Sequence, residues 1–210
     1  ITGCLPFNAP YTRNFDTDAD NAPATCWVQY NNYNPSAYAR VETPSVFNAA
    51  QPISPANFLE IFSSAGGTTS DTLMAVSPEF TDLTASNKQI KFQAAAQNAS
   101  DVLYIATTSS QTPGSAYNII DTITFSAANT WQFVILPINA STGYNGTDDH
   151  IVFLHGLTNT FTDIYIDDFE YELIPACSQL TSVSLNSAGV TNASFSYTGG
   201  GTAVQYEWGP

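Results

Sequence analysis

The sequence has very few basic residues: four lysines and arginines stand against 18 aspartates and glutamates, a formal net charge of −14 over 210 residues. Such a charge repels phosphate backbones and anionic lipid surfaces, so we exclude nucleic acid and membrane surfaces as partners. Long hydrophobic runs are also missing. No stretch approaches the ~18 apolar residues that are needed to cross a bilayer, and we expect no membrane insertion.

Cysteine and histidine are scarce as well, with three cysteines (Cys4, Cys26 and Cys177) and two histidines (His150 and His155). No two cysteines form a CxxC pair and the histidines lie far from them, which argues against a zinc site. One disulfide and one remaining thiol are expected, and a disulfide indicates an oxidising compartment. Because only 10% of the residues are charged and the chain starts at isoleucine, we expect a processed piece of a longer secreted protein.

Helical periodicity is almost absent, and strand patterns take its place. Seven runs rich in β-branched and aromatic residues alternate with period two or nearly so: 58–64, 89–95, 101–108, 118–125, 130–138, 150–156 and 163–173. Clusters of Gly, Ser, Asn and Thr separate them, as expected for turns. Strands without intervening helices predict an all-β, antiparallel two-sheet jelly-roll sandwich over residues 1–175. The proline-rich window 34–57 is predicted to be a long loop over one end of the sandwich.

A second pattern starts after IPACSQL, at residues 174–180. The segments LTSVSLNS, NASFSYTGGG and AVQYEWGP indicate three short strands in residues 176–210. About 35 residues are too few for an independent sandwich core, which needs roughly seven strands. We therefore predict that this segment is the first part of a second β domain and that it does not fold alone.

The last strand of the sandwich poses a question. Its side chains should alternate between two faces. One predicted face carries Tyr165, Asp167, Phe169, Tyr171 and Leu173, and the other carries Ile166, Asp168, Glu170 and Glu172. An ionised carboxylate that faces a core costs several kcal/mol unless it is paired or bound to a metal. Asp167 therefore requires a partner.

Six segments, taken in order, carry a resemblance: PYTRNFD…ATCW (10–27), SDTLMAVSPEF (70–80), KQIKFQAAAQNASDVLYIATTSS (88–110), WQFVILPI (131–138), DHIVFLHG (149–156) and IYIDDFEYE (164–172). Residues 1–175 resemble the MAM-like, cleaved-adhesin-type jelly-roll domain of large secreted bacterial surface proteins, often exported by type IX secretion. Residues 176–210 similarly resemble the opening strands of a fibronectin type III module, with Tyr197 where that family usually has Trp. The resemblance implies a module of stalks and adhesins.

Calcium is the cation that this pattern favours for Asp167, because cationic side chains are few and carboxylates are hard ligands. The resemblance implies the same ion, since the family associates the positions of Asp16 and Asp167 with bound calcium, although it more often has Glu at the former. Asp18 is predicted as a third ligand of this structural ion, and Asp71 is a weaker candidate. The alternative is that Asp16 and Asp18 form turns while Asp167 accepts hydrogen bonds from backbone amides.

The sequence leaves two alternative pairings for the disulfide. If the first and last strands pair antiparallel with Asp16 near Asp167, Cys4 comes close to Cys177, which favours a Cys4–Cys177 bond. The resemblance implies the alternative Cys4–Cys26, because the MAM family has a disulfide near its first strand. A Cα separation beyond about 7 Å excludes either pair.

Ligand binding is the function that these patterns favour, and no catalytic residue is predicted. Tyr30, Tyr33 and Tyr38 stand among asparagines, a mixture that suits a glycan contact, although the tyrosines of a loop can also simply pack on the sandwich. The three carboxylates Asp168, Glu170 and Glu172 share a strand face, as in jelly-roll glycosidases, but in a different order and on a terminal strand.

We therefore expect a non-enzymatic, calcium-stabilised adhesion or carbohydrate-binding module at the cell surface. Its partners would be a glycan or an extracellular protein, together with neighbouring domains of the same chain. The alternatives are a purely structural spacer and, third, a jelly-roll glycoside hydrolase.

Overall fold

The computed structural model describes residues 4–32, 34–44, 50–64, 71–175, 180–188 and 193–199. It divides the chain into two compact units, Ile1–Leu173 and Ile174–Pro210. No helix among the described residues has the length and apolar character to span a membrane.

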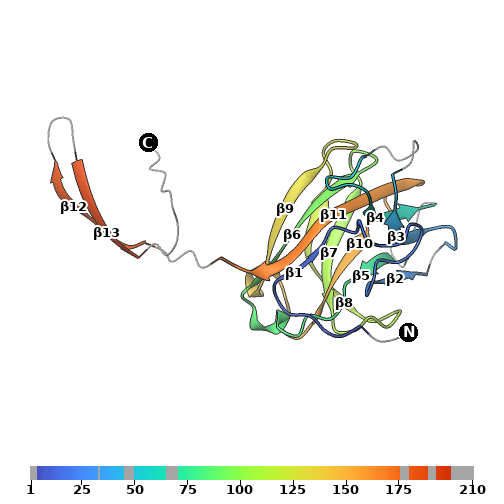
Figure 1. The fold of residues 1–210 in the computed structure, drawn as a ribbon, viewed down its shortest axis with the longest axis horizontal. Helices are drawn as coiled ribbons and strands as arrows, with labels where there is room; N and C mark the ends of the chain where they lie inside the picture. Colours follow the sequence, from blue (N-terminus) through green and yellow to red (C-terminus); the bar gives the residue numbers. More distant parts are fainter. Residues whose placement is uncertain are drawn as a thin grey trace. The chain divides into compact units, whose positions relative to one another are not determined.

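The first unit is a sandwich of two antiparallel sheets (Figure 1), which confirms the predicted all-β jelly-roll class. The first sheet has the strand order β3-β4-β11-β6-β9, with β1 also paired to β11, and the second has the order β2-β5-β10-β7-β8. The strands are β1 Tyr11–Arg13, β2 Val28–Asn31, β3 Tyr38–Glu42, β4 Phe58–Ser63, β5 Leu73–Val76, β6 Lys88–Ala96, β7 Val102–Thr108, β8 Tyr117–Thr124, β9 Gln132–Ile138, β10 His150–His155 and β11 Thr162–Leu173.

The core lies between the sheets and is rich in aromatic rings. Trp27 stacks on Phe153 with ring centroids 6.0 Å apart, and Phe169 meets both rings edge to face. Aliphatic side chains from both sheets fill the remaining space, because every second residue of each strand points inward. The seven predicted strand runs all correspond to strands, with ends that differ by at most two residues.

Four short strands, β1, β2, β3 and β5, lie outside the seven predicted runs, and two of them, β3 and β1, differ from what was predicted for their segments. The window 34–57 was predicted to be a loop, but β3 lies within it and pairs with β4. The first strand was expected to include Asp16, near Asp167, whereas β1 is Tyr11–Arg13 and Asp16 and Asp18 follow it in a turn and a bend. Both strands depend on partners that are distant in the sequence, so local alternation does not reveal them.

The predicted faces of the last strand were half wrong, because β11 contains a β-bulge. Asp167 is paired with Gln93 but Glu170 with Lys91, so the register shifts between Asp167 and Glu170. Before the bulge, Ile166 points into the core. After it, Phe169 takes the inward position. Asp167 is therefore not in the aromatic core of the sandwich.

Asp167 instead accepts hydrogen bonds on the outer side of the first sheet. Backbone amides of Ile53 and Ser54 donate to its Oδ2 at 2.8 and 3.1 Å, and its Oδ1 accepts from the Asp168 amide at 2.8 Å. The side chain is fully buried, and burial raises the pKa of Asp167 to about 6. This arrangement is the backbone-amide alternative that the sequence left open.

The second unit contains two described strands, β12 Leu180–Ala188 and β13 Ala193–Gly199, which form an antiparallel pair. The third predicted strand, at AVQYEWGP, lies outside the described residues. The assignment of this unit to a fibronectin type III module stays a prediction.

Candidate functional site

The outer face of the second sheet carries a row of large side chains. Strand register places Tyr30, Met74, Leu154 and Tyr104 side by side across β2, β5, β10 and β7. Met74 and Leu154 are buried and belong to an apolar cluster outside the main core, and both tyrosines pack against it. A face that points away from the core and is still apolar is a candidate for ligand binding.

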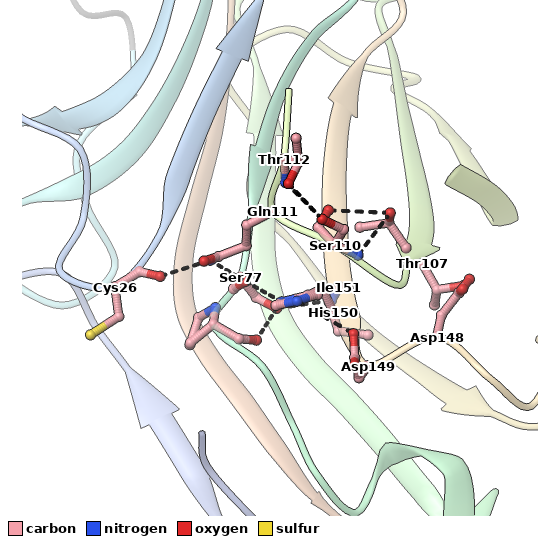
Figure 2. Close-up of polar contacts among 12 residues, drawn as sticks. Cys26, Ser77, Thr107, Ser110, Gln111, Thr112, Asp148, Asp149, His150 and Ile151 are labelled. Atoms are coloured by element: carbon pink, nitrogen blue, oxygen red, sulfur yellow. Dashed lines mark hydrogen bonds and ion pairs between the residues drawn. The ribbon is translucent and has the colours of Figure 1, made fainter. Parts of the chain in front are cut away.

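The β7–β8 loop, residues 109–116, crosses this outer face. Gln111 Nε2 donates to the carbonyls of Cys26 and Ser77, at 3.0 and 2.8 Å (Figure 2). Further along the loop, Gly114 has a positive φ of 82°, and a Cβ at this position would lie 3.8 Å from the Tyr30 hydroxyl. The loop thus runs from the β7–β8 edge of the sheet to β2 at the opposite edge.

A cavity of about 270 Å³ lies on the β7–β8 side of this face. Tyr104, Tyr117, Ile119 and Asp71 are among the residues that line it. Tyr117 and Ile119 belong to the edge strand β8 and are 38% and 45% exposed. Two tyrosine rings, an aliphatic side chain and a carboxylate therefore share one open cavity.

A second cavity, of about 440 Å³, is lined by residues 109–111 of the loop and by residues at the beginnings of β2 and β10. Gln111, Glu79, Asp149 and His150 contribute polar groups to its wall. His150 Nδ1 lies 2.9 Å from the Ser77 carbonyl oxygen (Figure 2). Its Nε2 lies 3.3 Å from Asp149 Oδ1, close enough for an ion pair when the imidazole is protonated but without hydrogen-bond geometry.

The sequence-predicted tyrosines do not form one site. Tyr30 lies on the outer face of the second sheet, whereas Tyr38 lies on β3 in the first sheet. The ring of Tyr38 is covered by the Arg40 guanidinium at 3.7 Å, and its hydroxyl donates to Glu60 at 2.8 Å. Tyr33 lies outside the described residues. Of the three, Tyr30 adjoins the apolar face described above.

The residues that the sequence missed are Tyr104 and Tyr117. A signal for Tyr104 was present, because alternation in DVLYIATT puts it opposite the core positions Leu103 and Ile105. Asp71, considered only as a weaker metal ligand, lines the same cavity as both tyrosines.

The predicted calcium ligands each contact other groups. Asp18 is buried, forms an ion pair with Arg13 and accepts hydrogen bonds from the amide and hydroxyl of Thr25 at 3.0 and 2.6 Å. Asp16 accepts from the Asn57 amide at 3.2 Å, and Asp167 binds the backbone as described above. Within the part of the chain that the structure describes, no three acidic, histidine or cysteine side chains converge as a metal site would require. As placed, these carboxylates do not fit one calcium, and the ion stays a prediction.

The predicted acidic face of β11 is present and is partly neutralised. The Lys91 ammonium lies 2.5 Å from Glu172 and 3.8 Å from Glu170. The hydrogen bond from Lys91 lowers the pKa of Glu172, so this residue is poorly suited to act as a general acid. Asp168, with φ of 49°, sits in the bulge.

A pair of carboxyl groups with raised pKa values lies elsewhere on the first sheet. Burial, followed by the nearby charge of Asp163, raises the pKa of Glu60 to about 8. Burial also raises the pKa of Asp163, to whose carboxylate the Tyr165 hydroxyl donates at 3.1 Å. Glu60 and Asp163 are 2% and 7% exposed, so no open cleft surrounds them.

The predicted Cys4–Cys177 disulfide was wrong. Cys4 is bonded to Cys26, with a Cα–Cα distance of 5.6 Å. Cys4 precedes β1 and Cys26 precedes β2, so the bond joins two segments that the sandwich brings together at one end. Cys177 lies outside the described residues.

Comparison with known proteins gives structural neighbours only. No family model matches the chain, and no curated protein matches it in sequence. The K2 cleaved adhesin domain of Lys-gingipain superposes with a TM-score of 0.63 at 12% identity, covering 79% of this chain and all of that one. The K1 domain of Lys-gingipain from Porphyromonas gingivalis W83 gives a TM-score of 0.58 at 16% identity, covering 78% and 98%.

A more distant neighbour is the family 11 carbohydrate-binding module from Clostridium thermocellum in complex with a β-1,3-1,4-mixed-linked tetrasaccharide. Its TM-score is 0.46 at 15% identity, with 75% of this chain and 92% of that chain covered. The chain therefore has the sandwich fold of cleaved adhesin domains, and its function has to be argued from its own residues.

Proposed function

We propose that the first unit is a non-catalytic glycan-binding module of a secreted adhesion protein. One observation carries the proposal: Tyr104 and Tyr117, from adjacent strands, line one cavity on the outer face of the second sheet together with Asp71. Tyrosine rings stack on the apolar faces of sugar rings, and carboxylates accept hydrogen bonds from sugar hydroxyls.

The spacing of the two tyrosines suits an extended ligand. Tyr104 pairs with Thr122 and Tyr117 pairs with Thr108, so the tyrosines stand four residues apart along the strands. At ~3.3 Å per residue this separation is roughly 13 Å between backbone positions. Ile119, which is paired with Ala106, lies between the tyrosines and continues the platform. A chain of sugar units along β8 would contact all three side chains.

The cavity at residues 109–111 would supply polar contacts to a ligand that is long enough to extend to it. Glu79 and Asp149 offer acceptors to sugar hydroxyl groups. Gln111 offers its side-chain oxygen and His150 offers Nε2, because Gln111 Nε2 and His150 Nδ1 already contact backbone carbonyls. Their cavity of about 440 Å³ is in the size range of small-molecule sites, roughly 300–1,000 Å³.

The arrangement of the carboxylates favours binding over glycoside hydrolysis. A glycosidase needs an acid and a second carboxylate on opposite sides of an accessible bond. The raised-pKa pair Glu60 and Asp163 is buried, and Glu172 on the acidic face is paired with Lys91. A spacer without a ligand is the second candidate, and it is distinguished by the binding experiment below.

The disulfide and the adhesin-like fold support an extracellular location, because disulfides persist in oxidising compartments. Export by type IX secretion, structural calcium and a following fibronectin type III module belong to this proposal as further expectations.

The test is a printed glycan array probed with the wild type, Tyr117→Ala and the control Phe161→Ala. Phe161 is 66% exposed and does not line either cavity, so the control removes an exposed aromatic ring elsewhere. We expect wild type and control to give the same hits. Tyr117→Ala should weaken them about tenfold, which corresponds to about 1.4 kcal/mol. An array without wild-type hits would support the spacer instead.

A further inference from the structure

The first sheet has a cavity of its own on the opposite side of the sandwich. Its volume is about 510 Å³, and it lies where β1, β6, β9 and the bulge of β11 meet. The residues that line it are Thr12, Arg13, Asn14, Gln93, Phe133, Asp168, Phe169 and Glu170. None of these residues takes part in the glycan site proposed above.

The bulge in β11 shapes this cavity. Because the register shifts after Asp167, two residues of β11 stand opposite Phe92 alone, and Asp168 adopts a left-handed φ of 49°. Such a φ is uncommon for a residue other than glycine, and bulges re-aim side chains next to binding sites. The bulge thus brings Asp168 and Glu170 into one cavity.

Phe133 supplies an exposed ring at the other side of the cavity. It belongs to the edge strand β9, pairs with Gln93 and is 58% exposed. Covering an exposed phenylalanine ring is favourable, because it removes apolar surface from water. A sugar ring can cover it by stacking its C–H groups on the face of the ring.

The polar lining fits the hydroxyl groups of such a sugar. The amides of Gln93 and Asn14 both donate and accept, and the carboxylates of Asp168 and Glu170 accept. Arg13 also lines the cavity, but its guanidinium is paired with Asp18. The two carboxylates therefore leave the lining acidic and disfavour phosphorylated ligands through charge repulsion. An uncharged polyhydroxylated ligand with an apolar ring face can stack on Phe133 and form hydrogen bonds with the polar lining.

We propose that this cavity is a second glycan-binding site, so that a single domain binds two glycan chains. The inference rests on the proposed function only for the class of ligand, because no residue is shared between the two sites. The sites lie on the outer faces of opposite sheets, which point away from each other. One domain would therefore cross-link two chains, and binding to a surface dense in glycans would gain from avidity.

The test compares five proteins on one printed glycan array: wild type, Phe133→Ala, Tyr117→Ala, the double variant and a control. Ile135→Ala is the matched control, because Ile135 lies on the same strand, is 52% exposed and does not line the cavity. Each single variant should keep part of the wild-type signal, the double variant should lose all of it, and Ile135→Ala should match the wild type.

Agglutination gives the second readout. Beads coated with the array glycan that binds the wild type most strongly should be agglutinated by monomeric wild type and by Ile135→Ala, and by neither single variant. If Phe133→Ala matches the wild type in both assays, the second site is refuted while the first one stands. If Phe133→Ala abolishes binding and Tyr117→Ala changes nothing, the second site holds and the proposed site on the second sheet is wrong. A wild type without any array signal refutes both.

Discussion

Replacing Glu60 with glutamine should change how the stability of the first unit depends on pH. Glu60 lies on β4, is 2% exposed and accepts a hydrogen bond from the Tyr38 hydroxyl. Burial and the neighbouring Asp163 raise its pKa to about 8, from an ordinary value of 4.5. The folded protein therefore holds a proton on Glu60 over a pH range in which the unfolded chain has lost it.

The sign of the effect follows from this difference. Because the folded pKa is raised, the stabilisation from Glu60 is complete below pH 4.5, declines as the pH rises, and is lost above about pH 8. Since each pKa unit corresponds to about 1.36 kcal/mol, the shift that Glu60 shares with its neighbour Asp163 amounts to several kcal/mol of stability. Glutamine has nearly the same volume and does not titrate, so it removes this dependence.

The assay is urea unfolding of the wild type, Glu60→Gln and Glu172→Gln at pH 5 and pH 9. At pH 5 the wild type and Glu60→Gln should differ little, and at pH 9 the glutamine variant should be the more stable by several kcal/mol. Glu172 is the control, because its pKa is lowered by the hydrogen bond from Lys91 and it stays ionised over this range. Asp163 interacts with Glu60, so the comparison reports the titration of this pair of carboxyl groups. Titrating groups away from the pair are common to the three proteins and cancel. If the difference in the free energy of unfolding between the wild type and Glu60→Gln is the same at both pH values, Glu60 is not a buried, protonated carboxyl group.

The remaining predictions concern two other aspartates. Asp82 accepts a hydrogen bond from the Tyr171 hydroxyl at 2.8 Å, and its carboxylate lies 3.3 Å from the buried Lys88 ammonium. Because Asp82→Ala removes both contacts, it should lower the free energy of unfolding by about 3 kcal/mol and the melting temperature by about 6–12 °C. A loss under 2 °C would mean that the remaining contact of Lys88 with Asn87 is sufficient. The calcium prediction can be tested by melting. Free calcium at about 100 times its dissociation constant adds about 2.7 kcal/mol to the free energy of unfolding, which raises the melting temperature by roughly 5–11 °C. Asp167→Ala should remove this increase. If the wild type has the same melting temperature in calcium and in EDTA, the prediction of a bound ion is wrong.

Much of the fold could be predicted from local pattern, because alternation with period two directly reports which side of a strand is buried. The run HIVFLHG was predicted as a strand and forms β10, which is central in its sheet. By contrast, β3 consists of five residues in a proline-rich window and becomes a strand only by pairing with β4. Short strands of this kind are determined by distant partners and leave little trace in the local sequence.

The binding residues show the same division. Alternation puts Tyr104 on the side of its strand opposite Leu103 and Ile105, and this side is indeed the outer one. Tyr104 and Tyr117 share a cavity because β7 pairs with β8. Asp71, which is distant in the sequence, joins them only through the tertiary fold. The adjacency of Tyr30 and Tyr38 in the sequence was misleading, because the chain crosses from one sheet to the other between them.

The sequence by itself determined that the chain forms an antiparallel β sandwich, is strongly acidic and has an acidic outward side on its last strand. Only the tertiary structure decided the partners of individual side chains. The bulge in β11 reverses the alternation, so Asp167 points toward the amides of Ile53 and Ser54, and Cys4 meets Cys26 instead of Cys177. The physical reason is that burial leaves a periodic pattern along each strand. A one-residue shift of register, or the meeting of two distant segments, arises from packing between strands and is not recorded in the pattern of either one.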